Sequence, residues 1–275
     1  MRSAFLVAVT IVLIAAPFGA AEEKDCHTLV DLYEFDGPSH RNDVPTGLRT
    51  GPDFVAVSGY TEKDADGFDA DAFLTVWRPG TAEMPTTSVW DGPAGGYDSF
   101  FDLHYAIEVP ASPVFAAGYA ANNVTNGDFS LVVFDEDANV VNEDFFDAGA
   151  GGDDCAFAVT KSGNAIFAVG YGQPNGQADV DWAVVKYDLD GHRLWNRAFA
   201  GTGGGHDVAR KVAPDGQGGI VVGGVGGRDR PGTDRRAMGQ EWKLTAMRFG
   251  RRPVGRPDAD HRRGHARRAD PGDRW

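Results

Sequence analysis

Residues 151–195 decide the fold, and they read GGDDCAFAVTKSGNAIFAVGYGQPNGQADVDWAVVKYDLDGHRLW. A glycine pair precedes Asp154, and sixteen residues after Asp154 an apolar run contains Gly170. A second strand pattern, from Asp181 to Tyr187, opens on an acid and closes on an aromatic residue. The Asp-Gly pair at 190–191 then suits a tight hairpin turn. The segment therefore predicts several short strands joined by turns.

Three other segments copy this unit. The sixteen-residue spacing returns from Asp43 to Gly59 and from Asp207 to Gly223, and the unit from Asp98 to Gly118 has four extra residues. Successive glycine landmarks lie 52 to 59 residues apart. Repeats of this length are typical of arrays whose units bury their apolar faces against one another.

Each unit offers four short strands, counting the strand that begins at the glycine pair. One four-stranded antiparallel sheet cannot bury two apolar faces alone, but sheets stacked radially bury them on each other. The sequence therefore predicts an all-β fold, a β-propeller of four-stranded antiparallel blades, with about four blades and an open or truncated ring. A β-solenoid is the alternative, although its coils are usually shorter and lack regular hairpin turns.

The units resemble the β-propeller repeats of secreted microbial proteins, often called seven-bladed β-propeller or SBBP-type repeats. The resemblance rests on the Gly-Gly-x-Asp openings, on the strand Ile166-Phe167-Ala168-Val169-Gly170-Tyr171 and on residues 181–195, and it covers residues 33–249. It implies a propeller that is incomplete here, because the family has more units. It implies hardly anything about activity, because these motifs specify a fold rather than a chemistry.

The N-terminus has the layout of a secretory signal peptide. Arg2 precedes the apolar run 5–16, and Gly19-Ala20-Ala21 supplies the small residues of a cleavage site. We predict a signal peptide at residues 1–21, a propeller domain at 22–249, and a secreted or extracytoplasmic location, in the periplasm or at the cell surface. An uncleaved N-terminal anchor is the alternative, although the apolar run is short for a membrane span. No later segment approaches that length.

The composition changes near Arg228. Residues 1–227 hold 12 Lys and Arg against 33 Asp and Glu, a net charge of −21, whereas residues 228–275 hold 14 against 7, a net charge of +7, and the two sum to −14. We predict a disordered, Arg-rich tail at residues 250–275. Four interpretations stay open: a solvated tail, a partner for the acidic body, an arm that binds anionic polymers, and an out-of-frame translation product.

Four carboxylates crowd one loop between two predicted strands: Asp64, Asp66, Asp69 and Asp71. Because Ca²⁺ takes several oxygen ligands and tolerates flexible loops, they predict a calcium site, with calcium as the candidate cofactor. A solvated acidic loop is the alternative, because the spacing departs from the EF-hand loop and no downstream Glu completes it.

The cysteines and histidines indicate no catalytic or metal centre. Cys26 and Cys155 lack metal-ligand spacing, and whether they pair stays open. Asn123-Val124-Thr125 is a glycosylation sequon whose use also stays open. The histidines show no pairing that suggests a triad, and no serine lies in a Gly-x-Ser-x-Gly setting.

We therefore expect a non-catalytic binding or scaffolding module whose loops bind a protein or a glycan. Nucleic acid is not an expected partner, because the body is acidic. Self-association through open sheet edges is expected if the ring stays open. The alternatives are a fragment without a function of its own and a propeller enzyme. The enzyme would act on polysaccharide or be quinoprotein-like, with Trp195 matching a tryptophan that packs between blades in such repeats.

Overall fold

The computed structural model describes residues 9–15, 28–51, 53–78, 81, 83–106, 109, 112–122, 126–149, 151–174, 178–201, 205–226 and 243–249. These residues form seventeen strands and no helix. The strands are β1 (Val9–Ala15), β2 (Thr28–Phe35), β3 (Asp43–Thr50), β4 (Val55–Glu62), β5 (Ala70–Trp77), β6 (Thr86–Trp90), β7 (Ser99–Tyr105), β8 (Val114–Ala121), β9 (Gly127–Phe134), β10 (Val140–Phe146), β11 (Cys155–Ser162), β12 (Ala165–Gly172), β13 (Asp181–Tyr187), β14 (Arg193–Phe199), β15 (Val208–Pro214), β16 (Ile220–Gly226) and β17 (Lys243–Phe249).

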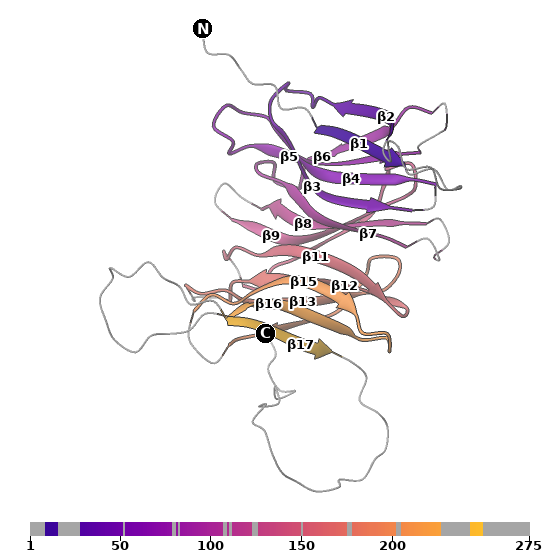
Figure 1. Ribbon diagram of the computed structural model, residues 1–275. Helices are drawn as coiled ribbons and strands as arrows, with labels where there is room; N and C mark the ends of the chain where they lie inside the picture. The colour runs from indigo at the N-terminus through magenta and orange to yellow at the C-terminus, as the bar shows by residue number, and fades with distance from the viewer. Residues whose placement is uncertain are drawn as a thin grey trace, which may run out of the picture.

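The strands form successive antiparallel sheets that follow the chain. Three sheets have four strands each, β3–β6, β7–β10 and β11–β14, and β15–β17 form a three-stranded sheet. We call these the first, second, third and fourth blades. They lie one upon the next from the N-terminal to the C-terminal end of the molecule (Figure 1). In the described part of the chain no sheet joins the first blade to the fourth, so the ring is open. The predicted all-β propeller architecture is confirmed.

Apolar side chains fill the space between neighbouring blades. Phe100 and Leu103 of the second blade pack with Leu74 and Val76 of the first. Ile166 of the third blade belongs to a cluster with residues of the second. The same arrangement recurs between the third and fourth blades, where Trp182, Val184, Ile220 and Val222 pack together. Each blade thus buries its faces against its neighbours, as the repeat length predicts.

A β-bulge explains why each unit contains its landmark glycine. The first strand of each blade carries a register shift, for example between Ala156 and Ala158. A Cβ atom on Gly170 would lie 1.8 Å from the carbonyl oxygen of Cys155. The corresponding distances are 1.9 Å at Gly59, 2.0 Å at Gly118 and 2.2 Å at Gly224. Only glycine allows this close backbone approach.

The fourth landmark is Gly224, so the assignment of Gly223 was wrong. Gly224 pairs with Ala209 as Gly170 pairs with Ala156. Within the described part of the chain, no atom lies within 4 Å of the Cβ position of Gly223. Two adjacent glycines left the sequence spacing ambiguous by one residue, and the position of the bulge resolves it.

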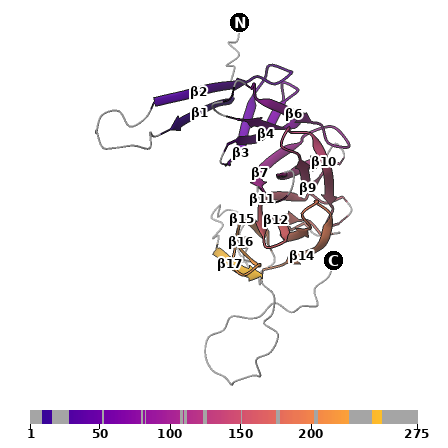
Figure 2. The ribbon, with the colours of Figure 1, turned by 90° about the vertical axis from the view of Figure 1, so that its right-hand side faces the viewer.

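The first blade is preceded by a two-stranded ribbon. β1 pairs antiparallel with β2, and Figure 2 shows this ribbon extending sideways from the first blade. Phe35, at the end of β2, packs on Phe73, with ring centroids 4.9 Å apart. β1 falls inside the predicted signal peptide, whose other residues lie outside the described part, as do Cys26, Asn123 and residues 250–275. None of the described segments forms a helix long and apolar enough to cross a membrane.

Candidate binding face

The connections between strands gather at two opposite ends of the blades, because consecutive strands are antiparallel. One end, which we call the loop face, carries residues 36–42, 63–69, 91–98, 122, 126, 147–149, 151–154, 173–174, 178–180, 200–201 and 205–207. The other end, the turn face, carries the shorter hairpins such as 135–139 and 188–192. The predicted hairpin at 188–192 is confirmed there, with Asp188 N–H donating to His192 O at 3.0 Å.

The repeated aspartate of each unit binds backbone N–H groups on the loop face. Asp43, Asp98, Asp154 and Asp207 are all buried. Each accepts a hydrogen bond from the N–H six residues earlier, which belongs to Gly37, Gly92, Ala148 and Gly201 respectively. Asp98 and Asp154 also accept from the N–H groups of Ala121 and Gln173, both at 2.8 Å. Asp98 and Asp154 therefore each join the connection before their own blade to the end of that blade's second strand.

Burial changes the protonation of two of these carboxylates. Desolvation, opposed by the backbone N–H groups and reinforced by Asp91 and Asp71, raises the pKa of Asp98 to about 6. Desolvation likewise raises the pKa of Asp154 to about 7, with Asp147 and Asp128 reinforcing it. Loss of solvent penalises the charged form, and neighbouring carboxylates penalise it further.

These two pKa values predict a pH dependence of stability. Both folded pKa values exceed the unfolded value of 3.8, so between about pH 4 and pH 7 the folded chain binds more protons than the unfolded chain. The free energy of unfolding should therefore fall as pH rises through this window. We expect a higher urea midpoint at pH 5 than at pH 7.5, and a smaller difference in an Asp98→Asn, Asp154→Asn double variant. A difference that the double variant leaves unchanged would refute this assignment.

Two groups of three carboxylates lie on the loop face, at equivalent places in the repeat. Asp71, Asp91 and Asp98 have oxygens within 4.8 Å of one another, and so do Asp128, Asp147 and Asp154. We call these the first and second triads. Each takes one aspartate from the start of a third strand, one that follows a fourth strand, and the repeated aspartate of the next unit. In the next copy Ala200 takes the middle position, so only Asp181 and Asp207 remain.

A lysine lies against the first triad. Lys63 Nζ lies 2.6 Å from Asp71, 3.0 Å from Asp69 and 3.5 Å from Asp91. Burial alone would lower the pKa of Lys63, but hydrogen bonds to Asp71 and Asp69 outweigh it and raise the pKa above its usual value. The first triad therefore already holds an ammonium group from its own chain.

The four aspartates of the predicted calcium loop serve different contacts. Asp69 and Asp71 bind Lys63, whereas Asp64 accepts a hydrogen bond from the N–H of Phe68 at 3.0 Å. Asp66 is exposed. The structure thus brings Asp71 together with Asp91 and Asp98, neither of which the sequence predicted as a calcium ligand. Calcium binding by the loop stays a prediction.

A cleft opens on the loop face beside the second triad. It has a volume of about 270 Å³ and is lined by Pro93, Ala94, Ala120, Ala121, Asn122, Asp128 and Phe145. Its walls are mostly apolar, and its polar groups are the Asn122 amide and the Asp128 carboxylate. Asn122 Nδ2 donates to Asp128 at 2.5 Å, while Asn122 Oδ1 is buried and has no hydrogen-bond partner among the described residues. A cleft of this size with few polar groups resembles small-ligand sites.

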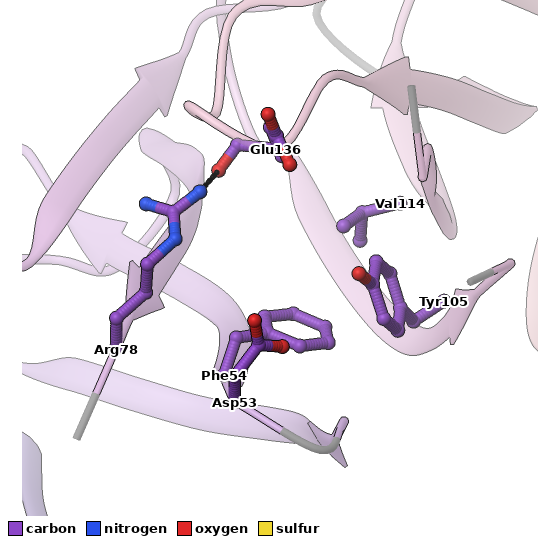
Figure 3. A pocket seen from close by; sticks show the side chains of 6 residues that line it. All are labelled: Asp53, Phe54, Arg78, Tyr105, Val114 and Glu136. Carbon is purple, nitrogen blue, oxygen red and sulfur yellow. Dashed lines mark hydrogen bonds between the residues drawn. The ribbon is translucent and has the colours of Figure 1, made fainter. Parts of the chain in front are cut away.

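The turn face offers a much smaller cavity, at the boundary between the first two blades (Figure 3). It has a volume of about 30 Å³. Arg78 reaches across it and donates to the carbonyl oxygen of Glu136 at 3.0 Å, and the Phe54 and Tyr105 rings lie 3.9 Å apart between centroids. This volume holds about one water molecule.

Also on the turn face, one hairpin brings together Asp188, Asp190 and His192. Of these residues, Asp190 and His192 are exposed.

A row of partly buried aromatic rings passes between the blades near the loop face. Tyr60 lies 5.2 Å from Tyr97, and Tyr97 lies 6.1 Å from Tyr119. Tyr171 occupies the same repeat position as Tyr60 and Tyr119 and lies 5.7 Å from Phe157. Desolvation raises the pKa of Tyr97, Tyr119 and Tyr171, so all three keep their hydroxyl protons at neutral pH.

The structure shows the surroundings of two residues discussed in the sequence analysis, Cys155 and Trp195. Cys155 is buried with a free thiol. Trp195 packs on the cluster between the third and fourth blades, with its ring 6.1 Å from Phe167, as expected for a packing residue.

Neither a scan of protein-family models nor a search of curated proteins finds a match for this chain.

Proposed function

We propose that this chain is an exported, non-catalytic binding module of the secreted SBBP-type propeller repeats, and that it takes its ligand on the loop face. The cleft beside the second triad carries the proposal, because the turn-face cavity of about 30 Å³ is too small for an organic ligand. The apolar lining supplies burial, and the few polar groups supply orientation.

The chemistry of the loop face favours a positively charged protein partner. Among the described residues of the loop-face connections, the only Lys and Arg are Arg41 and Lys63, against many aspartates. Lys63 is already held by three carboxylates. Opposite charge steers association and suppresses like-charged partners.

A glycan is the second candidate, and the row of tyrosines favours it. The rings of Tyr60, Tyr97 and Tyr119 lie in sequence across the boundary between the first two blades, and the Tyr119 hydroxyl donates to the Asp153 carboxylate. Aromatic faces accept the C–H groups of sugar rings, and hydroxyls and carboxylates bond to sugar hydroxyls.

Binding of the full chain to immobilised poly-L-lysine tests the main proposal. An Asp91→Asn, Asp147→Asn variant of the loop face should bind about fivefold more weakly, because two close charge pairs are worth about 1 kcal/mol together. A matched Asp188→Asn, Asp190→Asn variant of the turn face should change affinity less than about twofold. Equal losses in both variants would overturn the assignment of the loop face. Binding on a glycan array that the loop-face charges do not affect would favour the glycan candidate.

A further inference from the structure

The two triads differ in one residue that decides what they can bind. Thr61 pairs with Asp71 as Ala120 pairs with Asp128, so Lys63 and Asn122 occupy the same repeat position. Lys63 Nζ contacts Asp71 Oδ1 at 2.6 Å, and Asn122 Nδ2 contacts Asp128 Oδ1 at 2.5 Å. The Asn122 side chain is neutral and shorter than that of Lys63, and within the described part of the chain it makes no hydrogen bond to Asp147. We infer that the cleft beside the second triad binds a primary alkylammonium group. The nitrogen of this group would take the position that is equivalent to that of Lys63 Nζ against the first triad.

The second triad has no cation of its own in the described part of the chain. No ion pair joins Asp128, Asp147 or Asp154 to a basic side chain there. The neighbouring connections 91–98, 122–126, 147–154 and 173–180 contain no Lys, Arg or His anywhere in their sequence. Asp69, which also binds Lys63, corresponds to the neutral Asn126, so the second site lacks one carboxylate as well as the ammonium group of the first.

The cleft matches both parts of an alkylammonium group. Asp128 and the unpartnered Asn122 Oδ1 are acceptors for its N–H groups. Pro93, Ala120 and Phe145 provide apolar wall for the methylene chain. Charged hydrogen bonds at one end and apolar contact along the stem are how lysine side chains are normally accommodated.

Ca²⁺ fits this place less well than an amine. It takes six to eight oxygen ligands. Both oxygens of Asp154 already accept backbone N–H groups, from Ala148 and Gln173, and Asp128 Oδ1 accepts from Asn122. Few lone pairs remain, whereas an ammonium group needs only three acceptors.

The inference rests on the proposed function and specifies the ligand chemistry of the same cleft. Its test is a titration of the isotope-labelled full chain, followed by amide chemical shifts, with n-butylammonium and with an end-blocked Gly-Lys-Gly peptide. Saturable shifts at Ala121, Asn122 and Asp128 are expected with both probes. Acetylation of the peptide lysine should weaken binding at least about tenfold, because it removes the charge. Binding of butylammonium alone would identify free amines as the ligand source, and tighter binding of the peptide would identify a lysine of a protein.

Asn122→Lys is the decisive variant, because it gives the second triad the ammonium of the first. It should abolish amine binding and raise the melting temperature by about 2–4 °C, the shift expected for about 1 kcal/mol in a chain of this size. Asp128→Asn, whose side chain has nearly the same shape, should also remove binding. This variant provides a second test if Asn122→Lys does not fold. No saturable shifts, shifts caused by Ca²⁺ but not by amine, or amine binding that survives Asn122→Lys would each overturn the inference. Retained poly-L-lysine binding would then show that the proposed loop face still stands.

Discussion

Replacing Gly170 with alanine should lower the free energy of unfolding by at least about 3 kcal/mol, the upper range for overpacking a buried site. The new Cβ would lie 1.8 Å from the carbonyl oxygen of Cys155 and 2.8 Å from its carbonyl carbon. These are backbone atoms of a paired strand, so no side-chain rotation relieves the clash. Separation of β11 from β12 would weaken the third blade, on which both neighbouring blades pack. Urea denaturation of the purified variant measures the loss.

Gly223→Ala is the matched control, because Gly223 also lies in the second strand of a blade. None of the described residues places an atom within 4 Å of its Cβ position, and its backbone is not in the left-handed region. Alanine there should leave stability unchanged or raise it by up to about 1 kcal/mol, since glycine loses more backbone entropy on folding. If Gly170→Ala is as stable as Gly223→Ala, the bulge does not require the glycine.

Asp154→Ala should cost about 2–3 kcal/mol. The substitution leaves the N–H groups of Ala148 and Gln173 without their acceptor, and an unsatisfied buried donor costs about 1–3 kcal/mol. The loss is smaller than the sum of two such bonds, because the variant also removes a carboxylate that its neighbours repel. The urea midpoint at pH 7.5 is the measurement.

Asp154→Asn and Asp190→Ala are the control variants for this prediction. Asparagine keeps one acceptor and should lose less than alanine does. Asp190 is exposed on the turn face, so its removal should stay within about 0.5 kcal/mol of the parent chain. Equal stability of Asp154→Ala and Asp190→Ala would show that the repeated aspartate does not hold the loops in place.

The sequence was sufficient for the architecture because the repeat imposes its residue types at fixed places. Glycine recurs at the position of Gly170 because each unit has a bulge there, and a side chain would clash with the paired strand. Aspartate recurs at the position of Asp154 because its carboxylate accepts hydrogen bonds from backbone N–H groups. Few other residue types fit either position. The length of each connection is not constrained in this way. The fourth glycine was therefore misplaced by one residue, where Gly223 and Gly224 are adjacent.

The candidate binding face was harder to predict because its groups come from strand ends and connections that are separated in the sequence. Asp64 and Asp66 drew attention by local density, yet Asp71 meets Asp91 and Asp98 instead. The connection 63–69 is longer than its counterpart 122–126, which hid the equivalence of Lys63 and Asn122. Strand pairing reveals that equivalence, and a sequence alignment anchored on Asp71 and Asp128 would have found it.

The central claim is that successive units fold as sheets that lie against one another in chain order. Nuclear Overhauser contacts between aromatic rings of neighbouring blades test it most directly. The account predicts contacts between Phe101 and Phe157 and between Tyr60 and Tyr97, whose ring centroids lie 5.4 and 5.2 Å apart. A folded chain that shows strand contacts within each unit but neither of these ring contacts would contradict the claim.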